Sequence, residues 1–405
     1  MIPFTRMLKY GHELQTGSVR SLDLSADGCM YLVDSFGDMF AYGPNMYGMR
    51  GTGSTGGSVY PFGWVKILGG VQRAFTNGSR SLVALMEDGR VMVSGTNNRY
   101  AFGGDYGANL YSFTDVSSTM PVPNDQIKSF KPFYTGSVIL TTDNRLFWSG
   151  YNSYGLNGSG LNNNVLQSYT QVDPSSVIGV GAIIKDVHVY GFSASGYDVS
   201  VLELLDGKIY GAGSNAYKVI TGATTTSYLT YTLMTSFPVT HISMGDRMCT
   251  FQRAVTNASN VTNIYTYYSG TNGPVGQYIL NQYLAPGPTT SGKSGTATAS
   301  YTWFIYISAD GQRMYGGGAA GSNPISPSTA QTTPSSTIWH SIPSTVSPYD
   351  YKFYSSSKEL LLYYPGTGVA GSAKLYALGT LVNQATSVGV SYIEIKLPVS
   401  AGGTA

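Results

Sequence analysis

Charged residues are scarce in this sequence. Lys, Arg, Asp and Glu make up 11% of the 405 residues, and the formal net charge at pH 7 is +2, whereas about a quarter of an ordinary soluble protein is charged. A nucleic-acid-binding surface needs a concentration of Lys and Arg, so this balance argues against a nucleic-acid partner. Ser, Thr, Asn and Tyr must therefore cover most of the surface.

Cysteine and histidine are also rare. The two cysteines, Cys29 and Cys249, lie far apart without a Cys-x-x-Cys pair, which favours two free core thiols over a disulfide. The four histidines lack His-x-x-x-His or His-Glu-x-x-His spacing, so we expect no metal site and no cofactor. Asp and Glu mostly occupy turn positions, which accounts for them without acid–base chemistry. We expect no catalytic residues and no enzymatic activity.

Long apolar runs are absent as well. No segment approaches the roughly 18 consecutive apolar residues that a membrane-spanning helix needs. The first residues, Met1 to Arg6, do not form a basic and then apolar leader. The sequence therefore predicts neither a signal peptide nor insertion into a membrane.

A hairpin unit recurs along the whole chain. In its clearest copy an apolar stretch, 82–86, is followed by Asp88-Gly89 and a second apolar stretch that ends at Gly95. Asp-Gly is a strong signal for a tight hairpin turn. Seven hairpins with closing glycines about 56 residues apart are expected near 31–43, 82–95, 138–150, 201–213, 249–270, 304–318 and 360–379. A repeat of this length with several short strands is typical of propeller blades, so we expect one all-β domain, a seven-bladed β-propeller spanning 1–405.

The ends of the hairpins carry a second pattern. Gly43-Pro-Asn45-Met-Tyr-Gly48 and Gly150-Tyr-Asn152-Ser-Tyr-Gly155 share Gly-x-Asn-x-x-Gly, and the first half recurs at Asn97, Asn215 and Asn272. This unit resembles the repeat of the regulator of chromosome condensation (RCC1-like) family. The resemblance implies an RCC1-like propeller. Members of that family include exchange factors for small GTPases, protein-binding modules and secreted inhibitors.

The chain ends are expected to close the ring. Ser391–Leu397 alternates between apolar and polar residues, and Thr5–Tyr10 has the composition of a strand. An open ring would leave unpaired sheet edges. The sequence therefore predicts closure by N- and C-terminal strands that lie in the same blade or in neighbouring blades.

Long connections follow each Gly-x-Asn motif and are rich in aromatic residues. They run from about 97 to 126, 151 to 182, 214 to 237, 271 to 300 and 319 to 348. Loops of this length usually serve binding, and repeated insertions emerge on one side of a ring. We expect a ligand-binding rim formed by Tyr100, Phe102, Tyr106, Tyr111, Tyr151, Tyr154, Tyr217, Tyr228 and Tyr278. The alternative is that these rings only pack loop against loop.

The composition favours a structural or binding protein at the surface of a virion. An uncharged, aromatic and hydroxyl-rich rim suits a host glycan or protein, or a neighbouring virion protein, and such proteins need no leader. The alternative is a cytoplasmic protein-binding propeller, such as an exchange factor for a small GTPase, or a secreted inhibitor. The same fold serves several unrelated activities, so the fold does not decide between them.

Overall fold

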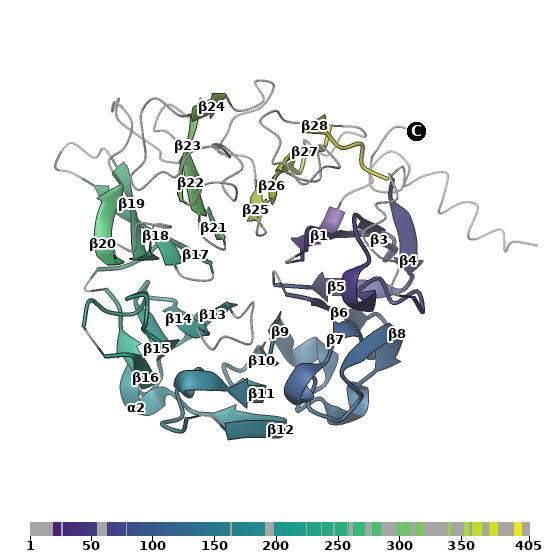
Figure 1. The fold of residues 1–405 in the computed structure, drawn as a ribbon, viewed down its shortest axis with the longest axis horizontal. Coiled ribbons are helices and arrows are strands. Elements are labelled where there is room, and N and C mark those ends of the chain that lie inside the picture. Colours follow the sequence, from purple (N-terminus) through teal and green to yellow (C-terminus); the bar gives the residue numbers. More distant parts are fainter. Residues whose placement is uncertain are drawn as a thin grey trace, which may run out of the picture.

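The computed structural model describes most of the chain (Figure 1). All statements below concern residues 19–25, 27–54, 63–77, 79–162, 164–190, 198–223, 225–235, 237–245, 248–256, 258, 262–271, 278–284, 298–300, 303–307, 313–318, 339–341, 352–355, 359–366, 372–379 and 393–398. The predicted strand at Thr5–Tyr10 lies outside these residues.

The described strands form seven sheets, each of four antiparallel strands that are consecutive in sequence. The first four sheets contain β1 (Val19–Leu24), β2 (Met30–Asp34), β3 (Met39–Tyr42) and β4 (Val65–Leu68); β5 (Val71–Phe75), β6 (Ser81–Met86), β7 (Val91–Thr96) and β8 (Asn109–Asp115); β9 (Ile127–Phe133), β10 (Gly136–Thr141), β11 (Leu146–Asn152) and β12 (Asn164–Val172); and β13 (Ile184–Tyr190), β14 (Val199–Leu204), β15 (Ile209–Ser214) and β16 (Ser227–Leu233).

The last three sheets contain β17 (His241–Met244), β18 (Met248–Thr256), β19 (Thr262–Thr271) and β20 (Tyr278–Leu284); β21 (Thr298–Ser300), β22 (Trp303–Ile307), β23 (Arg313–Gly318) and β24 (Trp339–Ser341); and β25 (Lys352–Ser355), β26 (Glu359–Tyr364), β27 (Lys374–Gly379) and β28 (Ile393–Glu394). The described helices are single turns, η1 (Met46–Gly48), η2 (Asn98–Tyr100), η3 (Ser117–Thr119), η4 (Asn124–Gln126), η5 (Ser153–Gly155) and α2 (Ser175–Ile178).

The sheets are arranged around a common axis as a β-propeller (Figure 1). The first strand of each sheet lies nearest the axis and contacts the first strand of the next sheet, in the order β1, β5, β9, β13, β17, β21, β25 and back to β1. Apolar side chains of adjacent sheets pack between them, as where Val138 and Trp148 of the third sheet meet Val187 and Leu202 of the fourth. The prediction of an all-β propeller is confirmed.

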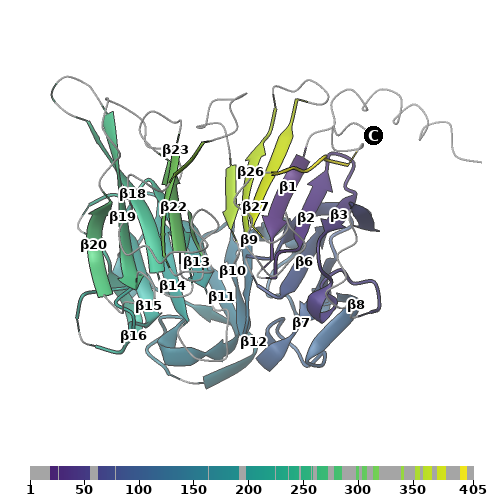
Figure 2. The same ribbon diagram turned by 45° about the horizontal axis from the view of Figure 1, so that its top comes forward.

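The first and last sheets lie side by side (Figure 2) and share one apolar cluster. Leu24 and Met30 pack with Leu361, Ile395 and other residues of the last sheet. The Trp64 Nε1 also donates to the Lys396 carbonyl at 2.8 Å. β28 completes its own sheet by pairing with β27. In the described part of the chain, therefore, the ends meet by packing between two sheets and not within one shared sheet, because each of the two sheets has four strands of its own.

Strand alternation gives the ring two different faces. Since the strands of each sheet are antiparallel and consecutive, the turns between second and third strands all lie at one end, which we call the hairpin face. The turns between first and second strands, and the Gly-x-Asn segments after the third strands, lie at the other end, which we call the loop face. Connections from one sheet to the next return along the hairpin face.

The tight turns of the hairpin face need positive backbone φ angles. Gly89 and Gly207 have φ of 93° and 84°, and Asn144 has φ of 72°. Glycine has no Cβ to clash in this region, and Asn tolerates it better than most residues. The turn signals at 88–89, 143–144 and 206–207 thus lie between paired strands for a local steric reason.

Both cysteines are buried and unpaired, as predicted. Burial raises the pKa of each thiol, because the thiolate would lose its hydration. Cys29 and Cys249 therefore act as small core residues.

Candidate binding surfaces

The repeated Asn of the loop face is a structural residue. Its side-chain Oδ1 accepts a hydrogen bond from a backbone N–H five residues later, and this contact recurs in four sheets. The pairs and their distances are Asn45 with Arg50 (2.9 Å), Asn97 with Phe102 (3.2 Å), Asn152 with Asn157 (2.9 Å) and Asn215 with Ile220 (3.0 Å). Each bond closes a compact loop immediately after the third strand.

The Nδ2 of the same side chains holds the far side of each loop. The Asn97 Nδ2 donates to the Gly107 carbonyl at 3.0 Å, and the Asn152 Nδ2 donates to the Leu161 carbonyl at 2.9 Å. These four Asn side chains are nearly inaccessible to solvent, with exposed fractions of 2–6%. A buried side-chain amide whose oxygen and nitrogen both have hydrogen-bond partners is costly to remove, because its partners would be left unsatisfied. The Gly-x-Asn motif thus orders its loop and has no free group for a ligand.

These loops also join neighbouring sheets. The backbone carbonyl four residues after the repeated Asn accepts from a buried Ser hydroxyl of the next sheet. The pairs are Ser94 with Met49, Ser137 with Ala101, Ser200 with Leu156 and Ser269 with Val219, at 2.5–2.9 Å. Each loop therefore belongs to the seam between two sheets.

The backbone of the glycine six residues after the Asn packs closely against an aromatic ring of the next sheet. Gly51 lies on Phe113 of β8, Gly103 on Tyr169 of β12, and Gly158 on Tyr231 of β16. A Cβ at any of these glycines would overlap the ring, and all three have positive φ. Both tyrosine hydroxyls keep a serine partner, since Tyr169 Oη lies 2.7 Å from Ser137 Oγ and Tyr231 Oη lies 3.4 Å from Ser200 Oγ. Burial accordingly raises the pKa of Tyr169 and Tyr231.

The expected aromatic rim is only partly present. Phe102 is fully buried in the core between the second and third sheets, so the prediction that it contacts a ligand is wrong. Tyr106 and Tyr228 are half-buried, and their hydroxyls bond to Thr119 at 3.1 Å and Thr221 at 2.6 Å. The alternative, that such rings pack loop against loop, describes these three residues better.

The remaining aromatic residues are more accessible. Tyr111 of β8 is 41% exposed, and Tyr100, Tyr151, Tyr154 and Tyr217 are half-buried. The Arg99 guanidinium lies 4.3 Å from the centroid of the Tyr151 ring. The backbone of Tyr278 belongs to β20. The connections that we expect to be binding loops thus contribute the outermost strands of the second to fifth sheets, which are β8, β12, β16 and β20. Their polar, β-branched and aromatic residues suit the half-exposed edge of a sheet.

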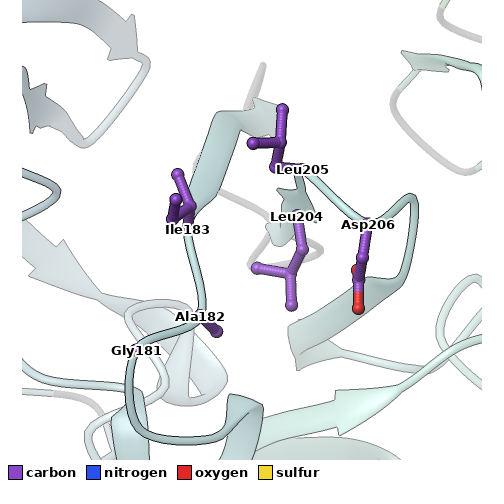
Figure 3. Close-up of a pocket in the computed structure, with 6 residues that line it drawn as sticks. All are labelled: Gly181, Ala182, Ile183, Leu204, Leu205 and Asp206. Carbon is purple, nitrogen blue, oxygen red and sulfur yellow. The ribbon is translucent and has the colours of Figure 1, made fainter.

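An apolar pocket opens on the hairpin face at the fourth sheet (Figure 3). It has a volume of about 410 Å³ and is lined by Gly181–Ile183, which precede β13, and by Leu204–Asp206, which end β14 and begin the hairpin turn. Leu204 is 2% exposed and lies at the base of the pocket. In Figure 3 the Leu204 side chain lies between those of Ile183 and Asp206, and the Leu205 side chain lies above it.

Large apolar side chains around this pocket are exposed to solvent. The exposed fractions are 53% for Ile183, 65% for Leu205 and 96% for Val180 in the preceding connection. Asp206 and Lys208 at the pocket edge form an ion pair at 2.8 Å. An apolar centre with a polar edge is the usual composition of a protein-docking site. We call this surface, formed by Val180, Ile183, Leu204, Leu205 and Asp206, the apolar docking surface.

Sequence reasoning overlooked this surface. Its only local signal is the apolar segment Val177–Ile183, which lies in a connection, and Leu205, which directly precedes a turn. Apolar residues at such positions have no strand to pack under, but single exposed apolar residues are common and carry no information alone. Only the fold brings the two segments together.

Beside the docking surface lies a buried carboxylate with two basic partners. Glu203 of β14 is 5% exposed and contacts Lys185 Nζ at 2.5 Å and His188 Nε2 at 2.9 Å. Burial alone would raise its pKa, but the hydrogen bonds and charges of His188 and Lys185 outweigh burial, so the pKa of Glu203 lies below its usual value. The carboxylate is therefore ionised at neutral pH and fixes both basic side chains.

Glu203→Gln is expected to lower the free energy of unfolding by about 1 kcal/mol at pH 7, because two basic groups lose their counter-charge. A lowered pKa in the folded state stabilises the fold above the unfolded pKa, and this contribution is lost as pH falls through the folded pKa. The difference between variant and wild type should thus shrink well below pH 4.5, the usual value. Urea denaturation at several pH values measures it. Asp206→Asn, at an exposed ion pair, is the control and should change stability little; an equal loss there would contradict the argument.

Solved structures with the same fold are known. The structure of Prp20p from Saccharomyces cerevisiae, described together with its binding to Gsp1p and histones, matches over 96% of this chain and 89% of that chain, at 12% identity and a TM-score of 0.64. Human WBSCR16 matches over 80% of this chain and 83% of that chain, at 15% identity and a TM-score of 0.56.

Yeast RCC1 (Prp20) bound to Kap60 matches over 83% of this chain and 77% of that chain, at 13% identity and a TM-score of 0.56. No protein-family model matches the sequence. At these identities the likeness establishes the propeller fold with RCC1-like neighbours and says nothing of the partner.

Within the described residues, no group of three or more His, Cys, Asp or Glu is placed to hold a metal ion. No helix in that part of the chain has the length and apolar character needed to cross a membrane.

Proposed function

We propose that this chain is a non-enzymatic, protein-binding propeller that docks a partner protein on its hairpin face. In this proposal residues 1–405 form a single seven-bladed, RCC1-like ring. The seven described sheets and the contacts between their first strands, from β1 to β25 and back, support it.

The observation that carries the proposal is the apolar docking surface. Leu205 lines a pocket that also contains the buried Leu204, and Val180 directly precedes the lining residue Gly181. Both Leu205 and Val180 are apolar and largely exposed to solvent. A partner side chain in a pocket of about 410 Å³ would remove this apolar area from water, at a gain of roughly 25 cal/mol per Å². Burial of that kind is the main source of affinity at the centre of protein interfaces.

The composition favours attachment to a host glycan from a virion surface, and a cytoplasmic protein-binding propeller is the alternative. The glycan hypothesis needs accessible aromatic rings on the loop face, and Phe102, Tyr106 and Tyr228 are used for packing. The alternative fits the docking surface and the RCC1-like neighbours better. Exchange activity toward a small GTPase is a narrower hypothesis within this alternative, and the fold alone does not support it.

Leu205→Asp is expected to reduce partner binding at least tenfold, because a carboxylate would have to be desolvated in the apolar pocket. The full-length tagged protein is used to capture partners from a lysate of source cells, and each captured protein is quantified by mass spectrometry. The affinity of any partner that the variant loses is then titrated with purified components.

Leu161→Asp is the matched control, since Leu161 is 59% exposed on the loop face. A partner bound by wild type and Leu161→Asp, but not by Leu205→Asp, supports the proposal. A partner that only Leu161→Asp loses, or that both variants retain, would contradict a binding site on the hairpin face.

A further inference from the structure

A β-bulge recurs at the second residue of the innermost strand. In each of the first four sheets the pairing between first and second strands skips one residue, and the skipped residues are Arg20, Gln72, Lys128 and Lys185. All four side chains are exposed. A bulge redirects a side chain out of the sheet and is common beside functional sites. Three of the four redirected side chains are cations in a chain with few charges.

These cations lie at the hairpin face, across the seams between sheets. The Arg20 Nη1 donates to the carbonyl of Val71, the first residue of β5, at 3.3 Å. The Lys128 Nζ donates to the carbonyl of Ile184, the first residue of β13, at 2.9 Å. Arg73, next to the bulged Gln72, donates to the carbonyls of Ile127 and Lys128. We call Arg20, Arg73, Lys128 and Lys185 the seam cations.

Carboxylates of this protein compensate the seam cations only in part. Arg20 pairs with Glu87 at 2.7 Å and Lys185 with Glu203 at 2.5 Å. Among the described residues, Lys128 and Arg73 have backbone carbonyls as their hydrogen-bond acceptors and are in no ion pair. A carbonyl bond fixes an ammonium or guanidinium group without neutralising its charge. Positive charge therefore remains where the third sheet meets its neighbours.

Two of the seam cations, Lys128 and Lys185, adjoin the apolar docking surface. Lys128 contacts the carbonyl of Ile184, which directly follows Ile183 of the pocket, and Lys185 is the next residue. A segment seated on the pocket would place its neighbouring residues within reach of both cations. Charges at the edge of an interface select complementary partners and speed their association.

We propose that the seam cations form a subsite for acidic side chains of the partner protein, so that the hairpin face recognises an acidic segment with an apolar anchor. This inference rests on the proposed function, because it assigns chemistry to the same docking face. Acidic peptide is favoured over nucleic acid because the basic groups adjoin an apolar pocket and the net charge of the chain is only +2.

Hexaglutamate carrying a fluorophore is a probe for the subsite alone. Its binding to the full-length protein is followed by fluorescence anisotropy at two salt concentrations, with hexaglutamine and a single-stranded oligonucleotide of similar length as comparisons. Lys128→Gln keeps a hydrogen-bond donor for the Ile184 carbonyl but removes the charge, and we expect it to weaken hexaglutamate binding about threefold or more. Lys374→Gln, at the Lys374–Glu394 pair of the last sheet, is the control and should leave binding unchanged.

Gln72→Lys is a second test that removes no charged contact. It completes the set of bulged cations, and we expect hexaglutamate to bind about threefold more tightly, with a steeper dependence on salt. Thermal unfolding of each variant checks that the fold is retained.

Failure of this inference is distinguishable from failure of the proposed function. If neither Lys128→Gln nor Gln72→Lys changes hexaglutamate binding, or if the oligonucleotide binds more tightly than hexaglutamate, the acidic subsite is refuted, whatever Leu205→Asp does. Leu205→Asn removes the apolar side chain without adding a charge beside the seam cations, so it should leave hexaglutamate binding unchanged, because the probe lacks an apolar anchor. If Leu205→Asp retains the partner while Lys128→Gln loses hexaglutamate, the subsite stands and the docking surface does not.

Discussion

Gly158→Ala is expected to lower the free energy of unfolding by about 3 kcal/mol. Gly158 has φ of 70°, where a Cβ costs roughly 1–2 kcal/mol. The added methyl group would also overlap the ring of Tyr231, which is 2% exposed and cannot move without disturbing the core between the third and fourth sheets. Overpacking of this kind costs roughly 1–3 kcal/mol more. Urea denaturation followed by tryptophan fluorescence measures the difference.

Gly160→Ala separates the two contributions. Gly160 lies in the same loop with φ of 84°, but the nearest atom to an added Cβ is the Thr230 methyl carbon at 3.8 Å. This variant should show the backbone cost alone, about 1 kcal/mol. Equal destabilisation of the two variants would mean that the glycine does not serve the contact between sheets.

Asn97→Ala is expected to cost about 2–3 kcal/mol. Its side chain is 4% exposed, accepts from the Phe102 N–H at 3.2 Å and donates to the Gly107 carbonyl at 3.0 Å. Alanine leaves these backbone groups without partners in a buried loop, and each such group costs roughly 1–3 kcal/mol. Because the loop covers Tyr169 of the next sheet, the change should also increase hydrogen exchange of β12 amides.

Asn98→Ala is the neighbouring control. Asn98 is half-buried at the start of η2, and no hydrogen bond of its side chain is seen within the described residues. Its free energy of unfolding should change by less than about 0.5 kcal/mol. A loss at Asn98 as large as that at Asn97 would contradict the structural role assigned to the repeated Asn.

Together these contacts explain why the two faces differ. On the loop face, Asn97, Gly158 and their equivalents use their polar groups and close approaches to hold adjacent sheets together. On the hairpin face, the turns are short and the apolar side chains of Ile183 and Leu205 are left exposed. The binding site that we propose therefore lies at the face where the repeat is least constrained by its own packing.

Local patterns in the sequence predicted the propeller because they report local energetics. An Asp-Gly pair such as Asp88-Gly89 favours one turn whatever surrounds it, since the backbone at Gly89 needs positive φ. Alternating and apolar stretches on either side then pair with each other over a short distance. The recurrence of this unit, and of Gly-x-Asn after it, indicated a repeat of equal sheets.

The same patterns misplaced Phe102 of the expected rim and did not indicate how Tyr106 packs. Phe102 and Tyr106 follow a Gly-x-Asn motif in a polar segment, which suggested an exposed loop. In the fold this segment turns back over the next sheet, so Phe102 enters the core and Tyr106 packs against it. Exposure depends on which surface a loop covers, and here that surface belongs to the next sheet along the chain, which is formed by β9 to β12.

Sequence alone determined the all-β class, the hairpin turns and the repeat of this protein, because steric preferences of Gly, Asn and Asp act over a few residues. Tertiary structure alone decided which residues remain free to bind. The docking surface joins a connection before β13 to the turn after β14, and the seam cations come from four innermost strands, β1, β5, β9 and β13, at or next to bulges near one end of the ring. Such sites depend on distances between sheets, and no local preference encodes those distances.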